Sequence, residues 1–451
     1  MRKIIQYMMM ALIAVVLASC ANDISEESTP TVKSNIRFVV DDFPMFEKPS
    51  TRTIGEEDKG KTAWAVGDEI CVKLESKELG TQTATLKYNG VKFEIQDGNS
   101  LCYLDGEPVT AYAYYAPNRR WRNGSLDFKD IYGNPNGTAE FLEATCTVHY
   151  GDNNYVDISF ANATRNYSRL RIATIPKTEI KVDADNFAPT DNPNRLYMTY
   201  TLTSDEKGNA YLYGTFYNNS IVTVKYRGAS LATHKFSKKT ENAKSYALDA
   251  TVISANSAEE IKSAIEQKVA DGKTTIRLNL APNAGTNEFM AIREAIKGAA
   301  PNDLGTIELT IIGVETIPEE AFYKMLQLKS VRMSDVKEIK KYAFKECQYL
   351  TVVEAPSLNK LYSGAFKKCD QLSKLTFGPI NYADARNWPI FEYITPNIDL
   401  ILSDYQKEMI ETDSYLYTAN NDRDYAGSDE HNSKNFLGRE FRSITCRYKV
   451  K

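Results

Sequence analysis

Ile339-Lys-Lys-Tyr-Ala-Phe-Lys-Glu-Cys-Gln-Tyr-Leu350 has two counterparts in the chain, one starting 22 residues earlier at Ile317 and one starting 22 residues later at Leu361. All three segments have an apolar residue at the first position, an Ala-Phe pair at the fifth and sixth, and Leu at the last. A fixed period of about 20 to 50 residues indicates stacked units, each burying its apolar side against its neighbours. This repeat, which spans Val314 to Phe377, anchors the fold prediction.

Each unit is predicted to contain a short strand and a helical turn. Leu372-Ser-Lys-Leu-Thr-Phe377 alternates apolar and polar residues, so we expect a strand with Lys374 and Thr376 pointing outward. The Ala-Phe pair should head the helical turn, where the Phe rings of successive units stack in a column. Together these features predict an α/β leucine-rich-repeat solenoid.

Two of the three units share a stricter pattern. Residues 339–350 and 361–372 read apolar-x-x-x-Ala-Phe-x-x-Cys-x-x-Leu, whereas the first unit has Met325 in place of Cys. This pattern resembles the repeat of BspA-like leucine-rich repeat proteins. Cys347 and Cys369 fall in equivalent inward columns, so we expect free thiols that act as small apolar side chains, although an exported location would permit disulfides.

The N-terminus indicates export. Two basic residues precede an apolar run from Ile4 to Ala18, which is shorter than the about 20 residues that span a bilayer and fits a signal peptide over residues 1–19. The run ends in Leu17-Ala-Ser-Cys20, which resembles a bacterial lipobox. The resemblance implies that Cys20 is acylated and that residues 20–33 form a tether on the outer membrane, exposed at the cell surface. The alternative is a cleaved signal peptide followed by an incidental Cys.

Residues 34–130 are predicted to form an antiparallel β-sandwich, because several segments alternate apolar and polar residues. These segments are 36–40, 70–74 and 91–95. Trp64 is expected in the core, and Gly67-Asp68 in a turn. Trp64-Ala-Val-Gly-Asp68, preceded by Thr51-Arg-Thr53 and followed by Tyr112-Ala-Tyr-Tyr-Ala-Pro117, resembles the N-terminal domain of the fimbrillin family, the subunits of type V pili.

A second β-sandwich is predicted over residues 138–252, after the turn-rich segment Gly133–Gly137, and it resembles the second fimbrillin domain. Its candidate strands are 155–160, 196–200, 210–213 and 222–226. Residues 255–451 are then predicted to form the repeat domain. Its helical cap opens at the capping-box pattern Ser257-Ala-Glu-Glu260, and the polar run 418–434 reads as a loop or a disordered insert. The predicted protein is therefore multidomain, with two all-β sandwiches followed by the α/β repeat solenoid.

Composition and motifs give no support to an enzyme. The 55 basic and 59 acidic residues give a formal net charge of -4, which offers no electrostatic case for nucleic acid binding. The chain has three His residues and no His-x-x-x-His, Gly-x-Ser-x-Gly or Gly-x-Gly-x-x-Gly pattern. The paired carboxylates Glu259-Glu260 and Glu319-Glu320 stand at expected helix starts, where the helix dipole favours negative charge. We therefore expect no catalytic site, no cofactor and no metal.

Candidate ligand contacts lie on the strands of the repeat. Solenoids present extended concave binding surfaces, and here the exposed ladder is predicted to carry Arg332, Glu354, Lys374 and Thr376. Residues 314–377 also carry 11 Lys and Arg against 8 Asp and Glu. This excess indicates either an ordinary solvated face or a patch for an acidic glycan or host protein.

These observations predict a non-enzymatic surface lipoprotein, an adhesin that binds a host or bacterial surface protein or glycan through its repeat domain. One alternative is an accessory or tip subunit of a type V pilus. Another is a glycan-capturing surface protein of a nutrient-uptake system.

Arg52 separates the first two of these readings. In fimbrillins a protease that cuts after Arg releases the leading strand, so the resemblance implies a possible cleavage site at Arg52, between the strand at 36–40 and Trp64. The alternative is an exposed loop Arg. The chain continues for about 200 residues beyond the second sandwich, which argues against polymerisation through its C-terminus. We therefore expect an uncut chain that begins at a lipid-blocked Cys20.

Overall fold

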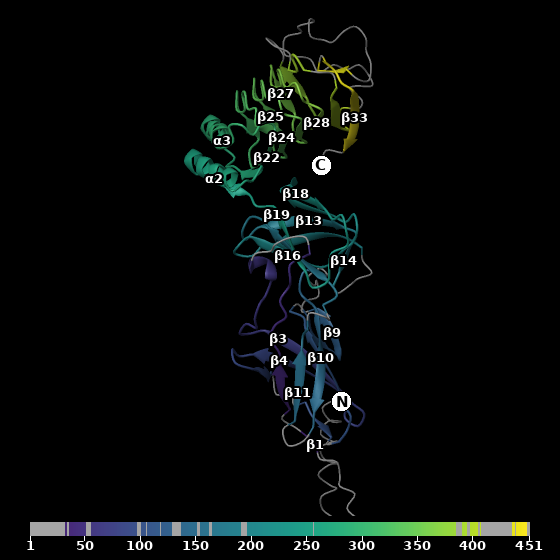
Figure 1. The fold of residues 1–451 in the computed structure, drawn as a ribbon. Helices are drawn as coiled ribbons and strands as arrows, with labels where there is room; N and C mark the ends of the chain where they lie inside the picture. Colours follow the sequence, from purple (N-terminus) through teal and green to yellow (C-terminus); the bar gives the residue numbers. More distant parts are fainter. Residues whose placement is uncertain are drawn as a thin grey trace, which may run out of the picture. The chain divides into compact units, whose positions relative to one another are not determined.

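A computed structural model describes residues 32–33, 36–50, 56–96, 101–104, 106–117, 119–128, 137–150, 154–161, 165–190, 196–255, 257–384, 390–394, 397–404, 406, 435–437 and 439–448 (Figure 1). Cys20, Arg52 and the predicted signal peptide lie outside these residues, as does the run 418–434. The chain divides into two compact units. The first unit is Met1–Pro44, Ala63–Gly133 and Phe141–Thr164, and the second is Met45–Thr62, Asn134–Glu140 and Arg165–Lys451. Among the described residues, no helix is long and apolar enough to cross a membrane.

The first unit is built on one seven-stranded sheet. Its order is β2 (Arg37–Val40), β11 (Tyr155–Ser159), β10 (Leu142–His149), β7 (Thr110–Tyr115), β3 (Glu69–Ser76), β4 (Gly80–Tyr88) and β5 (Phe93–Ile95). Two smaller pairs accompany it, namely β1 (Val32–Lys33) with β6 (Tyr103–Leu104), and β8 (Arg119–Arg122) with β9 (Ser125–Phe128). The sheet is antiparallel except at its edge, where β2 pairs in parallel with β11. The predicted antiparallel arrangement is therefore wrong for this one strand.

Trp64 packs in an aromatic cluster but is only half-buried, which is less than the predicted core position. Its ring is edge-on to four other rings, those of Phe43, Phe93, Tyr115 and Phe160. Its indole N–H donates to the carbonyl of Asp41 over 2.8 Å, so the polar end of the ring is also satisfied. The predicted turn follows, with Gly67 at φ +94° and the Asp68 carboxylate accepting from the N–H of Ala65 over 2.6 Å.

The second unit begins with a β-sandwich of two four-stranded sheets. One sheet has the order β14 (Phe187–Pro189), β16 (Asn209–Phe216), β12 (Ser168–Ala173) and β19 (Ser245–Asp249). The other has the order β15 (Tyr197–Thr203), β13 (Glu179–Asp185), β17 (Ile221–Tyr226) and β18 (Ala229–Lys235). Ile180, Val182 and Ala184, which are alternate residues of β13, are buried in its core, and this is the period expected for a half-buried strand.

Residues 45–50 and 56–62, here called the strap, fold with this second sandwich although they precede most of the first unit. The strap includes the 3-10 helix η1 (Glu56–Lys59). Phe46 is buried, and the guanidinium of Arg165 lies 3.9 Å from the centre of its ring. Arg165 also pairs with Glu140 over 2.9 Å, and Arg171 pairs with Asp58 over 2.6 Å. The predicted boundary at residues 34–130 did not anticipate this exchange of segments between the two units.

The rest of the second unit is a stack of coils, here called the repeat stack, with a long and a short parallel sheet (Figure 1). The long sheet has the order β20 (Ile253–Ser254), β21 (Thr275–Asn279), β22 (Ile307–Ile312), β24 (Leu328–Met333), β26 (Val352–Ala355), β28 (Lys374–Phe377), β30 (Asp399–Ser403) and β33 (Ser443–Tyr448). The short sheet has the order β23 (Thr316–Ile317), β25 (Glu338–Ile339), β27 (Lys360–Tyr362) and β29 (Tyr382–Asp384). A small hairpin pairs β31 (Asn435–Phe436) with β32 (Arg439–Glu440).

Two helices, α2 (Ala258–Ala270) and α3 (Thr286–Ala299), lie at the β21 and β22 end of the stack (Figure 1). The Ser257 hydroxyl accepts from the N–H of Glu260 over 3.2 Å, which is the predicted N-terminal cap of α2. Ile261 and Ile265 are buried on one face of this helix. The chain leaves the helix at Gly272, which has φ +73°.

The predicted helical turn at each Ala-Phe pair is wrong. A helix would direct each N–H to the carbonyl four residues back, but here alternate N–H groups bond to the next coil. The N–H of Phe322 donates to Ala343 over 2.7 Å, and that of Lys324 to Lys345 over 2.9 Å. Glu320 and Lys324 accordingly have positive φ angles of 56° and 54°, which no helix contains. The described repeats around the Ala-Phe pairs are therefore made of strands and turns, and the two helices with described bounds, α2 and α3, lie at one end of the stack.

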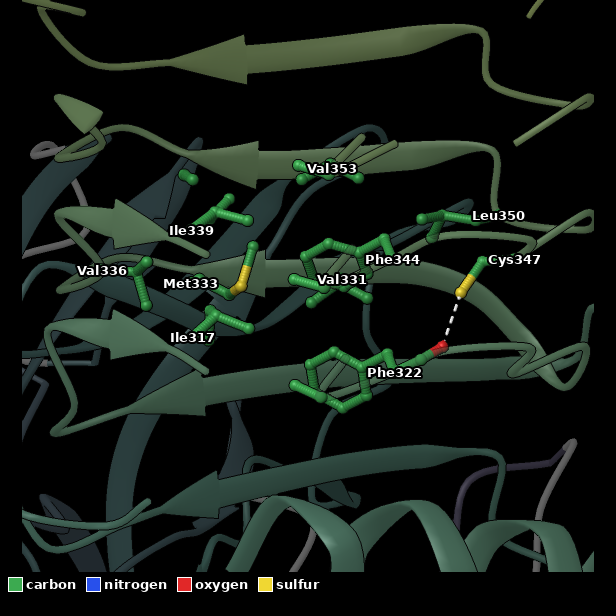
Figure 2. Packing of buried hydrophobic residues seen from close by; sticks show 14 of the residues in the cluster. Ile317, Phe322, Val331, Met333, Val336, Ile339, Phe344, Cys347, Leu350 and Val353 are labelled. Atoms are coloured by element: carbon green, nitrogen blue, oxygen red, sulfur yellow. Dashed lines mark hydrogen bonds between the residues drawn. The ribbon is translucent and has the colours of Figure 1, made fainter. Parts of the chain in front are cut away.

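The predicted column of Phe rings is present in the core of the stack. The centres of Phe322 and Phe344 are 5.1 Å apart, and those of Phe344 and Phe366 are 5.3 Å apart, with stacked rings in both pairs. Figure 2 shows Phe322 and Phe344 at successive levels, with the thiol of Cys347 donating to the carbonyl of Phe322 over 2.9 Å. Cys369 makes the equivalent bond to Phe344 over 3.0 Å. Both cysteines are free thiols, as predicted.

Candidate functional site

The four predicted ligand-facing residues come together on three adjacent strands of the long sheet. Arg332 on β24 is the register partner of Glu354 on β26, which is in turn the partner of Thr376 on β28. Lys374 lies two positions before Thr376 and therefore on the same side of β28. We call the outward side chains of β24, β26, β28, β30 and β33 the strand face.

Two of the four residues neutralise each other. The Nε atom of Arg332 lies 3.2 Å from Oε2 of Glu354, and the side chains are 37% and 33% exposed. A pair this exposed contributes at most about 1 kcal/mol to stability, because water screens it and ordering two long side chains has an entropic cost. It does, however, occupy the polar groups that a ligand would otherwise meet.

A second charge pair, which the sequence analysis missed, lies further along the strand face. The guanidinium of Arg442 forms a fork on the Asp399 carboxylate, with Nε 2.8 Å from Oδ1, and the Ser443 hydroxyl donates to the same oxygen over 2.6 Å. Arg442, together with Ser443, lowers the pKa of Asp399 to about 2. Asp399 is the register partner of Lys374 and follows it by 25 residues. Because this spacing departs from the 22-residue period, the repeat pattern did not predict the position of Asp399.

The polar groups between these two pairs are the Lys374 ammonium and the Thr376 hydroxyl, and both are available to a ligand. Within the described part of the chain, Lys374 has no ion pair or side-chain hydrogen bond, and neither does the hydroxyl of Thr376. Val352 is the register partner of Lys374, and Ile401 is the partner of Thr376. The centre of the strand face is thus an ammonium and a hydroxyl, both partly exposed and flanked by two aliphatic side chains.

The second sandwich covers the beginning of the long sheet. Arg277 on β21, in the same ladder as Arg332, is only 9% exposed in its side chain and donates to the carbonyl of Leu231. Burial lowers the pKa of its guanidinium, which lies 3.9 Å from the Asp249 carboxylate. Ile312 at the end of β22 is packed in the core of the sandwich. The open part of the sheet therefore begins at β24.

No metal-binding cluster accompanies this site. Among the described residues, no group of three or more His, Cys, Asp and Glu side chains could hold a metal ion. The open groups at its centre can donate hydrogen bonds and attract an anion, which are binding functions.

Residues 304–412 match the family model of the BspA type leucine rich repeat region, with six copies of the repeat. The matched segment is similar to this family of repeats. It contains β22 to β30 and thus most of the open strand face, including all four predicted ligand-facing residues. The resemblance seen in the 22-residue pattern is confirmed for this part of the chain.

Several solved structures resemble parts of the chain. A candidate cell adhesion protein from Bacteroides fragilis has a TM-score of 0.24 at 11% identity, covering 48% of this chain and 93% of its own. The fimbrial anchor protein Mfa2 from Porphyromonas gingivalis has a TM-score of 0.21 at 10% identity, covering 44% and 80%. The shaft pilin SpaA from Lactobacillus rhamnosus GG has a TM-score of 0.17 at 11% identity, covering 49% and 95%.

By name, these neighbours are adhesion, fimbrial and pilin proteins. TM-scores this low do not establish a common overall fold. No curated protein matches the sequence.

Proposed function

We propose that the protein is a surface adhesin that binds its partner through the strand face of the repeat stack. The observation that carries this proposal is the open centre at Lys374 and Thr376, framed by the closed pairs Arg332 with Glu354 and Asp399 with Arg442. The BspA-type repeat region supports it, because repeat stacks of this kind present extended faces to their partners. The partner is a protein or glycan on a host or bacterial surface that offers an anion to Lys374.

The proposal is tested by adherence. Bacteria that display the full chain are compared with bacteria that display Lys374→Ala combined with Thr376→Val, on cultured epithelial cells and on a second bacterial species. We expect adherence to fall about tenfold, corresponding to about 1.4 kcal/mol of binding free energy. Lys207→Ala is the control, since Lys207 is an exposed lysine of the second sandwich and lies outside the strand face. Equal adherence of wild type and double variant contradicts the proposed face, and no adherence by wild type contradicts the adhesin function.

We also propose that Cys20 carries the lipid that holds the protein on the outer membrane, with residues 20–33 as the tether. The lipobox resemblance of Leu17–Cys20 supports this. The remaining chain is proposed to divide into the predicted domains 34–130, 138–252 and 255–451, with the strap assigned to the second sandwich. Labelling cells with a radioactive fatty acid tests the anchor. The label should be absent from Cys20→Ala, and undiminished label on this variant would contradict a lipoprotein.

A further inference from the structure

Lysine ammonium groups lie over tyrosine rings along a second surface of the repeat stack, away from the strand face. This surface is formed by the short sheet and by the turns at the Ala-Phe pairs. We call it the lysine–tyrosine face, and its central residues are Tyr323, Lys340, Lys341, Tyr342, Lys345 and Tyr362.

The lysines on this face contact tyrosine rings of their own coil and of the neighbouring coils. The Nζ atom of Lys345 lies 5.1 Å from the ring centre of Tyr323 and 4.8 Å from that of Tyr342. Lys341 lies 4.8 Å from the same Tyr342 ring. Such contacts hold an ammonium in place without neutralising its charge. The face therefore presents fixed positive charges next to partly exposed aromatic rings.

One glutamate orders the short-sheet side of the face. The Glu338 carboxylate accepts from the Tyr362 hydroxyl over 2.6 Å and lies 3.0 Å from the ammonium of Lys340, which is itself 4.5 Å from the Tyr362 ring centre. Burial raises the pKa of Glu338, but the bonds from Tyr362 and Lys340 outweigh it, and the net pKa is lowered. The carboxylate is thus ionised at neutral pH and positions a ring and a cation side by side. The ring of Tyr382 follows on the next coil, 5.4 Å from that of Tyr362.

The face carries excess positive charge in a chain whose formal net charge is -4. Six lysines belong to it between residues 338 and 368. The same segment contains Glu338 and Glu346 on this face and Glu354 on the strand face, and Glu392 lies beside Lys367. Three of these lysines, Lys341, Lys360 and Lys368, have no ion pair among the described residues. An anionic partner would meet uncompensated charge here.

The surroundings favour a hydrophilic partner. Among the described residues from 314 to 384, no large aliphatic side chain is exposed. Protein interfaces are usually centred on apolar or aromatic anchors that fill pockets. This face offers no exposed aliphatic anchor, and its tyrosine rings are already in contact with lysines. Tyrosine rings flanked by cations instead suit the flat faces and charged substituents of sugars.

We propose that the lysine–tyrosine face binds an anionic polysaccharide, bearing sulfate or uronate groups, that lies along the axis of the stack. Neighbouring parallel strands are about 4.8 Å apart, so successive coils offer a cation and a ring at a spacing close to the length of one sugar in an extended chain. The lysines hold the anionic groups and the tyrosines contact the sugar rings. This surface is distinct from the strand face, and its ligand does not depend on the proposed function there.

Heparin, a sulfated polysaccharide, is the probe. The full chain is passed over immobilised heparin at physiological salt, and the variant Lys341→Ala, Lys360→Ala, Lys368→Ala is compared with it. We expect binding about tenfold weaker or more, because three cations that neutralise no carboxylate are lost. The matched control is Lys207→Ala, Lys235→Ala, Lys238→Ala, which removes three exposed lysines from the second sandwich. Equal losses in the two triple variants, or no binding by wild type, overturn the proposal.

Poly-L-glutamate, a polyanion without sugar rings, separates sugar recognition from charge attraction. We expect the full chain to bind heparin more tightly than poly-L-glutamate of equal charge, and equal affinity overturns the polysaccharide assignment. The strand-face variant Lys374→Ala with Thr376→Val should keep full heparin binding. If adherence to cells fails in that variant while heparin binding persists, the two surfaces act separately.

Discussion

Phe344 has a ring on each side of it in the core of the repeat stack. Phe322 and Phe366 stack on its two faces, and the side chain is completely buried. We expect Phe344→Ala to lower the free energy of unfolding by about 3 to 5 kcal/mol, because the cavity removes contacts with both neighbouring coils. Lys345→Ala, at the adjacent surface position, should change it by less than about 0.5 kcal/mol. Denaturant unfolding of the full chain measures both, and similar midpoints would show that the Phe column does not support the stack.

Cys347 should be chemically inert while the protein is folded. Burial raises the pKa of its thiol to about 12, and only the thiolate is a nucleophile. We expect iodoacetamide at pH 8 to leave Cys347 unlabelled in the native chain and to label it after denaturation, as read by mass spectrometry of its peptide. Rapid labelling of the native chain would contradict the buried bond to Phe322.

The same pKa shift sets the sign of a pH effect. An unfolded thiol ionises near its ordinary pKa of about 8.5, whereas the folded thiol stays protonated up to about 12. The unfolded state therefore loses a proton first, so this group leaves stability unchanged at neutral pH and lowers it as the pH rises above about 8.5.

At the scale of elements, the strap depends on buried charge. The Arg165 side chain is fully buried and the Glu140 side chain nearly so, and burial raises the pKa of Glu140 although the nearby guanidinium of Arg165 opposes this. Glu140→Ala removes a carboxylate from a guanidinium that cannot reach water. We expect a loss of about 3 to 5 kcal/mol of stability in the second unit.

Asp183→Ala is the comparison for this prediction, because it breaks an ion pair, with Lys225, that is 27% and 41% exposed. That loss should stay within about 1 kcal/mol. Thermal unfolding of the two variants measures the difference, and a Glu140→Ala protein as stable as Asp183→Ala would mean that the buried Arg165 does not need Glu140.

Elements with a local signal were predictable from the sequence, and long-range pairings were not. The strand Ile307–Ile312 and the cap at Ser257 follow from residues within a few positions of each other. The turn at each Ala-Phe pair was misread as helical because its hydrogen bonds run to residues about 20 positions away, as from Phe322 to Ala343.

In the candidate site, the Asp399–Arg442 pair and the burial of Arg277 also depend on residues that are distant in the sequence. Asp399 and Arg442 meet only because β30 and β33 are neighbours in the long sheet. The ladder of Arg332, Glu354 and Thr376 was predictable because all three obey the 22-residue period. The residues around Arg277 give no signal that the second sandwich covers it, because its partner Leu231 is 46 positions away.

At the scale of the whole molecule, segments of the first and second units alternate along the chain. The strap is the earliest of these exchanged segments, and Arg52 falls between its two halves. A protease acting there would cut a chain whose flanks are both held by the second sandwich. On the N-terminal side of Arg52, Phe46 is buried and Glu47 pairs with Lys244. On its C-terminal side, Asp58 pairs with Arg171.

These contacts lead to a prediction about the N-terminus of the protein on cells. Release of the leading strand β2 would require the loss of the Phe46 and Glu47 contacts as well as the parallel pairing of β2 with β11. We therefore expect N-terminal analysis of protein taken from cells to find a blocked Cys20. A chain nicked at Arg52 in vitro should also keep its two pieces together in native size exclusion and separate them only in denaturant. A clean start at Thr53 on cells, with the leading piece lost, would instead favour the pilus subunit over the anchored adhesin.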